Sequence, residues 1–348
     1  MEDKQKVRES GPDLLRVIAA VFVIGVHFYL NCGYYSAPLI STKLYIMTAA
    51  RWLFLICVPL YMMLTGYFKS EKTISKSHYL SLIPIAFSYV GISVIKMIMC
   101  NFVYGKVYTL SFAVRNILNY QIAWYMGMYL SLMLILPFLN KMWKACSGRR
   151  EHNIMIASFA FVSMCYPVFL YIAPSYWQML YPIVYYFLGI YIKEYRPKVK
   201  KWILLIVIIV TVTAEAVVSI IAANGNAFIW NVLGPVDSGY STITVAVTAV
   251  SMFLLIYDLD VRNSFIKKVL ANIAGLSFEI YLFSAAYDAI VFYYLKRYIY
   301  NAEDFFWIIF ISVPASFLLA WLSSFIYRQF YLLIRRLFIK CRGGMTFL

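Results

Sequence analysis

The sequence predicts an all-α fold, a polytopic bundle of roughly ten transmembrane helices that forms one membrane-embedded domain over residues 1–348. Hydrophobic residues make up 63% of the chain and charged residues 13%, and the mean hydropathy is +0.76. These values exclude an ordinary soluble domain. The apolar segments approach the length of about 20 residues that a helix needs to cross a hydrocarbon core. Barrel strands are excluded because the segments are too long and too uniformly apolar, and an open sheet edge cannot face lipid.

The apolar segments follow one another along almost the whole chain, leaving only connections and tails outside them. In the second segment, Pro59 loosens the helical backbone ladder and Gly66 allows a neighbouring helix to approach closely. Because so many apolar segments follow one another, we expect a multi-pass protein of a cell membrane, namely the bacterial plasma membrane. We predict spans at 14–31, 48–67, 79–103, 123–143, 154–173, 176–194, 201–223, 241–259, 273–295 and 305–327.

Basic residues predict the orientation of these spans, because Lys and Arg accumulate in cytoplasmic connections. They cluster at 4–8, 69–76, 141–150, 193–201, 262–268 and 328–342, whereas the alternate connections hold Lys43, Lys106, Arg115, Lys296 and Arg297. Both termini are therefore predicted inside the cell. This topology, together with anionic lipid headgroups, explains the formal net charge of +16, so no nucleic-acid partner is expected. The six cysteines are scattered, and neither a disulfide framework nor a metal site is expected.

Arg16 and His27, both in the first predicted span, are the leading candidates for a functional site. Eleven residues at about 100° each return the two side chains to nearly the same helix face, with His27 about 16 Å further along the axis. Ionisable residues inside a membrane are costly, which favours a functional role. The alternative is that Arg16 extends to the lipid headgroups and that His27 is a hydrogen-bonded packing residue.

Five stretches carry a resemblance to a known family. DLLRVIAAVFVIGVHF at 13–28 holds Arg16 and His27, and VPLYMMLTGYF at 58–68 ends the second span on Thr-Gly-Tyr. The pattern continues in WYMGMYLSLMLILPFLNKM at 124–142, YFLGIYI at 186–192 and ANIAGLSFEIYLFSAAYD at 271–288. Together they resemble the acyltransferase family 3 membrane proteins, whose core has ten spans with both ends inside.

The resemblance implies an integral-membrane O-acyltransferase. It would move an acyl group, taken to be acetyl, from cytoplasmic acyl-CoA to a hydroxyl of a cell-surface polysaccharide or lipid-linked saccharide. Acyl-CoA is then a co-substrate, and no bound cofactor is implied.

Two departures from the family pattern affect the site. Ser284 stands where many members have a histidine, and SKSHYLSLIP at 75–84 replaces an Arg-x-x-Arg cluster. Positive charge in this region comes from lysines, which act as point charges where arginine offers a planar fork. The residues expected to bind the donor are Arg16, Lys69, Lys72 and Lys76.

Acyl transfer needs a group that takes up the hydroxyl proton near neutral pH, and imidazole suits this role. His27 is the one histidine inside a predicted span. Counting inward from the cytoplasmic ends places Asp288 as deep as His27, and Glu279 near the level of Arg16. We expect Asp288 to orient His27 and Glu279 to pair with Arg16; alternatively, both acids only pack helices or face a solvated cavity. The other two histidines are expected in loops: His78 and His152.

Aromatic residues are candidates for binding the saccharide. Trp124, Tyr125 and Tyr281 are expected to line the acceptor cavity together with Ser284, although most of the 31 tyrosines belong to interfacial belts. The alternative function is a transporter or flippase of a polar solute or lipid-linked saccharide, which the two departures from the family pattern keep open. Its pathway residues would be Arg16, Glu215, Glu279 and Asp288.

Overall fold

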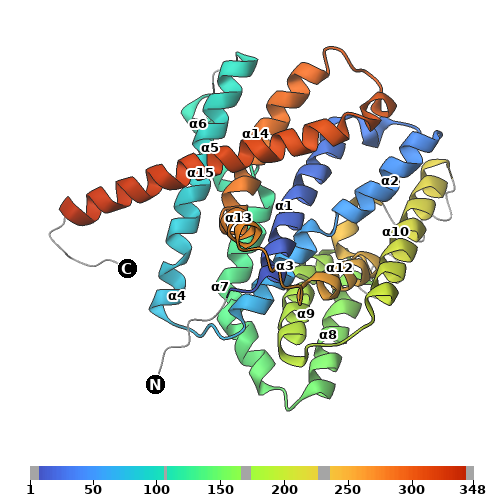
Figure 1. Cartoon of the computed structure of the whole chain (residues 1–348), viewed down its shortest axis with the longest axis vertical. Coiled ribbons are helices and arrows are strands. Elements are labelled where there is room, and N and C mark those ends of the chain that lie inside the picture. Colours follow the sequence, from blue (N-terminus) through green and yellow to red (C-terminus); the bar gives the residue numbers. More distant parts are fainter. Residues whose placement is uncertain (1–7, 106–107, 166–173, 226–235, 342–348) are drawn as a thin grey trace.

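The computed structural model describes residues 8–105, 108–165, 174–225 and 236–341 (Figure 1). The structure is 82% helix, with no strand in these ranges, which confirms the all-α prediction. The basic residues at 4–6, 106 and 342 and the end of the predicted span 154–173 lie outside the described residues.

Helices occupy the described part of every predicted span, with several breaks. The α-helices are α1 (Ser10–Asn31), α2 (Thr42–Phe54), α3 (Cys57–Lys69), α4 (Lys76–Leu80), α5 (Leu82–Tyr104), α6 (Leu110–Leu118), α7 (Trp124–Ala145), α8 (Arg149–Met164), α9 (Tyr181–Tyr195), α10 (Lys201–Ala223), α12 (Ile243–Ile256), α13 (Ser264–Gly275), α14 (Ser277–Leu295) and α15 (Ile309–Cys341). Short 3₁₀ helices are η1 (Tyr34–Ser36), η2 (Ser175–Leu180), η3 (Val236–Ser241) and η4 (Ala302–Phe306).

Among the described helices, six are long and apolar enough to cross a membrane. They are Ser10–Asn31, Thr42–Lys69, Lys76–Tyr104, Lys201–Ala223, Ser277–Leu295 and Ile309–Ile334. The chain is thus a multi-pass membrane protein, while the count of ten spans and the inside position of both termini stay predictions. Ile243–Ile256 is a shorter apolar helix.

Helix α1 lies in the middle of the bundle. It packs against α2, α3, α13, α14 and α15, and Figure 1 shows it between α5 and α10. The flanking helices expose large apolar side chains such as Phe102 and Ile209, as expected of surfaces that face lipid. Residues of α1 such as Leu15 and Ala19 are instead fully buried. The polar residues of α1 therefore face other helices.

The predicted second span is two helices, α2 and α3, separated at Leu55 and Ile56. Ser41 caps the start of α2 by accepting a hydrogen bond from the Leu44 amide at 3.3 Å. Pro59 lies in the first turn of α3, where its missing N–H leaves no intrahelical bond unmade. The break thus occurs just before the proline.

Helices α3 and α9 cross in close contact through two glycines. A Cβ atom added at Gly66 would lie 1.9 Å from the carbonyl oxygen of Tyr186, and one added at Gly189 would lie 1.9 Å from that of Met63. Small residues permit such an approach between membrane helices. The expected role of Gly66 is confirmed, and the contact fixes the position of α3 beside the site.

Candidate functional site

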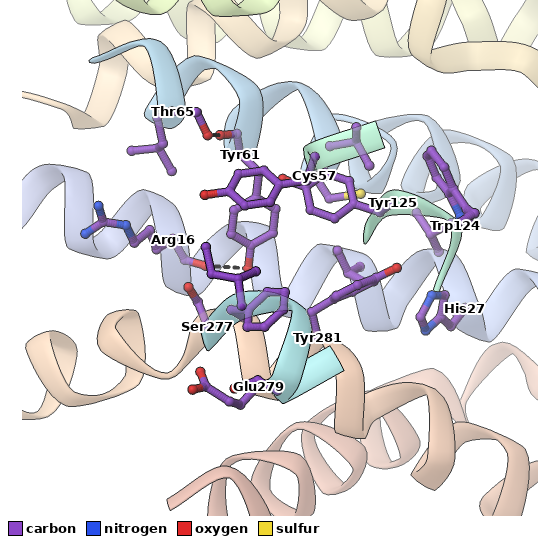
Figure 2. Close-up of a pocket in the computed structure, with 18 of the residues that line it drawn as sticks. Arg16, His27, Cys57, Tyr61, Thr65, Trp124, Tyr125, Ser277, Glu279 and Tyr281 are labelled. Atoms are coloured by element: carbon purple, nitrogen blue, oxygen red, sulfur yellow. Dashed lines mark hydrogen bonds between the residues drawn. The ribbon is translucent and has the colours of Figure 1, made fainter. Parts of the chain in front are cut away.

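A cavity of about 560 Å³ lies between α1, α3, α7 and α14 (Figure 2). We call one part the Arg16 end, which is lined by Arg16, Lys69, Glu279 and Arg328, and the other the His27 end, which is lined by His27, Leu30, Arg51 and Trp124. Figure 2 shows Arg16 and Glu279 on one side and His27 and Trp124 on the other. The volume is in the range of small-molecule sites, and both residues of the predicted helix face line it.

At the His27 end, Asp288 of α14 contacts the imidazole, with 3.0 Å between His27 Nδ1 and Asp288 Oδ2. The His27 side chain is 18% exposed and that of Asp288 only 4%. A carboxylate can only accept, so Nδ1 carries the hydrogen and the lone pair of Nε2 is left as a proton acceptor. No described residue bonds to Nε2. The expected contact between Asp288 and His27 is confirmed, while the catalytic role of the pair stays a prediction.

A further charge lies near this pair. Lys96 of α5 interacts electrostatically with Asp288, and its Nζ donates to the carbonyl oxygen of Ile122 at 3.5 Å. The sequence places Lys96 inside an apolar span, where a charge is costly, but does not indicate which acid it would neighbour.

At the Arg16 end, Arg16 forms an ion pair with Asp13, with 2.8 Å between Arg16 Nη1 and Asp13 Oδ1. Its guanidinium also lies over the Phe68 ring, 4.4 Å from the centroid. The expected pairing of Arg16 with Glu279 is wrong: Glu279 Oε1 accepts from Arg328 of α15. Asp13 is the nearer partner because it lies one turn away on the same helix.

The three lysines expected to bind the donor separate in the structure. Lys69 lines the cavity, whereas Lys72 and Lys76 are exposed and do not line it. The chain after α3 is held by Asn140, whose Nδ2 donates to the carbonyl oxygens of Lys69 at 2.9 Å and Lys72 at 2.8 Å.

Aromatic side chains form much of the middle and the His27 end. Trp124, Tyr125 and Tyr281 all line the cavity, and the Tyr125 and Tyr281 ring centroids are 5.4 Å apart. Tyr240 packs on Trp124 at 5.6 Å, and burial raises the pKa of its phenol well above the ordinary value. Ser284 is fully buried away from the cavity lining, with its Oγ donating to the carbonyl oxygen of Tyr281 at 2.9 Å.

The other histidines are not in loops, so that expectation is wrong. His78 is buried in α4 with Nε2 2.8 Å from the Met133 carbonyl oxygen. His152 is buried in α8 and stacks on Trp143 at 3.7 Å between ring centroids. Both are held by packing and backbone contacts, and neither lines the cavity.

Of three further charged residues, two line the cavity and one does not. Arg51 lines the His27 end and donates from Nε to the Tyr35 hydroxyl at 2.9 Å. Arg328 lines the Arg16 end. Glu215 accepts a hydrogen bond from Thr244 and does not line the cavity. Within the described ranges, no three His, Cys, Asp or Glu side chains gather as metal ligands.

The fold and the cavity define a multi-pass membrane protein with an ionisable, aromatic-lined site among its helices. The family model described as an acyltransferase domain matches residues 9–325, nearly the whole chain, and the chain belongs to this family, acyltransferase family 3. The protein is therefore a membrane acyltransferase. Comparison with curated proteins and with solved structures gives no match.

Proposed function

We propose that the protein is an O-acyltransferase of the bacterial plasma membrane that moves an acetyl group from cytoplasmic acetyl-CoA to a hydroxyl of a cell-surface polysaccharide or lipid-linked saccharide. The observation that carries the proposal is one cavity that has Arg16, Lys69 and Arg328 at one end and the His27–Asp288 pair at the other. A donor with phosphates at the Arg16 end reaches His27 through an extended arm, which the pantetheine portion of CoA provides.

His27 acts as the general base in this reaction. Its Nε2 takes the proton of the acceptor hydroxyl while the oxygen attacks the thioester carbonyl. The C–O bond of the ester forms, the C–S bond breaks, and the proton passes from His27 to the leaving thiolate. Asp288 fixes the imidazole tautomer and stabilises the positive charge that forms on the ring.

The two ends of the cavity suit different parts of the reaction. Arg16 is about 16 Å from His27 along α1, so it holds a distant part of the donor and does not stabilise the reacting carbonyl. Trp124, Tyr125 and Tyr281 offer flat apolar faces and hydroxyl groups of the kind that pack against sugar rings. A saccharide at the His27 end would present its hydroxyl to Nε2.

The transporter alternative has less support from the geometry. Of its four expected pathway residues, Arg16 and Glu279 line the cavity, whereas Glu215 and Asp288 do not.

The experiment that separates the two functions follows acetyl label from acetyl-CoA into saccharide, with purified protein in nanodiscs. Time-dependent label in the saccharide supports the transferase. In proteoliposomes, movement of saccharide across the bilayer without any label transfer would support the transporter instead.

A further inference from the structure

The sequence indicates Arg328 only as a basic residue just beyond the last predicted span. In the structure α15 continues through this position, and the Arg328 side chain lines the Arg16 end of the cavity. Its Nη2 donates to Glu279 Oε1 and, at 3.3 Å, to the carbonyl oxygen of Gly275. These contacts from α13 and α14 hold the guanidinium in place.

The contacts of Arg328 leave part of its donor capacity unused. A guanidinium has five N–H groups in a fixed fork, and Nε and Nη1 of Arg328 donate to none of the described residues. Arg16 uses Nη1 to bind Asp13, and Lys69 Nζ donates to none of the described residues. Three cationic side chains at one end of the cavity thus offer open N–H groups.

Asp13 pairs with Arg16 and Glu279 pairs with Arg328, so Lys69 is the one of the three cations that has no carboxylate partner among the described residues. Arg16 and Lys69 repel each other, and Glu279 is the one carboxylate among the described residues that line the cavity. The Glu279 carboxylate is not fully hydrogen-bonded. The residue is 4% exposed, and its Oε2 is buried without a hydrogen-bond partner among the described residues. Gathered cations are stabilised by an anion, and a buried carboxylate oxygen requires a donor. The excess positive charge favours an anionic ligand at this end, whereas Glu279 Oε2 has no surface in the cavity.

We propose that Arg328, positioned by Glu279, binds a phosphate group of the acyl donor together with Arg16 and Lys69. The inference rests on the proposed function, which supplies a phosphate-bearing thioester. Because both N–H groups of Nη2 are taken by Glu279 and Gly275, Arg328 donates to the phosphate from Nε or Nη1, as a charge-assisted hydrogen bond. Arg328 thereby supplies an arginine near the region at 75–84 that lacks an arginine cluster.

The test measures binding of CoA and of pantetheine, which lacks the phosphates, to the full chain in nanodiscs. Arg328→Gln should weaken CoA binding by about 10-fold to 100-fold, the range of a lost charged hydrogen bond, and leave pantetheine binding within about twofold. The matched control is Arg336→Gln, which removes the same charge from an exposed position on the same helix. It should leave both affinities unchanged.

Two further variants separate binding from folding. Arg328→Gln leaves Glu279 buried without its cation, so the double variant Arg328→Gln/Glu279→Gln removes both charges and should show the same loss of CoA affinity. Glu279→Gln alone keeps all three cations but removes the carboxylate that positions Arg328, so it should weaken CoA binding less than Arg328→Gln does. Equal weakening of CoA and pantetheine in the Arg328 variants would assign Arg328 a structural role and overturn the inference.

The outcomes also separate this inference from the proposed function. If the wild-type protein transfers acetyl and Arg328→Gln keeps the wild-type affinity for CoA, the phosphate-binding role of Arg328 is overturned, but the proposed function is not. If the wild-type protein neither binds CoA nor transfers acetyl, then acetyl-CoA is not the donor, and both the proposed function and this inference are overturned.

Discussion

Replacing Asp288 with asparagine removes the charge beside His27 with little change in side-chain volume. Asp288 Oδ2 lies 3.0 Å from His27 Nδ1, and only 4% of the Asp288 side chain is exposed. The asparagine can present its N–H groups to Nδ1, which favours the tautomer with the proton on Nε2. That tautomer has no lone pair for the acceptor hydroxyl.

The magnitude follows from the charge that forms on the ring during the reaction. Opposite charges about 4 Å apart interact by about 4 kcal/mol at an effective dielectric constant of about 20, which corresponds to about a thousandfold in rate. Lys96 also interacts with Asp288 and offsets part of this stabilisation. We therefore expect Asp288→Asn to lower kcat by about 100-fold to 1000-fold.

The assay is acetyl transfer to saccharide in nanodiscs, with CoA binding measured in parallel. CoA affinity should be unchanged, because Asp288 does not line the Arg16 end. Asp260→Asn is the control: Asp260 is exposed and pairs with Lys267 at 3.2 Å, so its loss should leave kcat unchanged. A kcat for Asp288→Asn within about threefold of wild type would refute the role of the carboxylate.

Two other predictions concern packing and the donor site. Gly66→Ala should destabilise the protein by about 3 kcal/mol or more, because the added Cβ would lie 1.9 Å from the Tyr186 carbonyl oxygen. The control in thermal unfolding is Gly275→Ala, whose added Cβ has no atom within 4 Å. Equal stabilities of the two variants would contradict the close packing at Gly66. Lys69→Gln should raise KM for acetyl-CoA by about threefold to tenfold, whereas Lys72→Gln should not, because only Lys69 lines the cavity. Equal effects of the two lysine variants would place the donor at the exposed loop instead.

The sequence predicts the helices well, because hydropathy and helical geometry act along one dimension. The shared face of Arg16 and His27 follows from their spacing, and both line one cavity. Asp288 likewise contacts His27, as the count along the two helices predicts.

The sequence does not predict which helices lie side by side in the bundle. Glu279 lies near the depth of Arg16, but depth does not reveal which neighbouring helix supplies its cation. The predicted last span ends at 327, so Arg328 is assigned to a solvated tail, although α15 continues to Cys341. His78 and His152 are misplaced for a similar reason, since their partners on α7 are distant in sequence or beyond a connection.

The most direct test of the account measures CoA binding and acetyl transfer in the same preparation of His27→Ala. In the proposed reaction the donor binds at the Arg16 end and the chemistry takes place at the His27 end. We therefore expect this variant to insert normally, to bind CoA as wild type does, and to transfer no acetyl group to saccharide. Acetyl transfer at a rate near that of wild type would contradict the central claim that His27 performs the reaction.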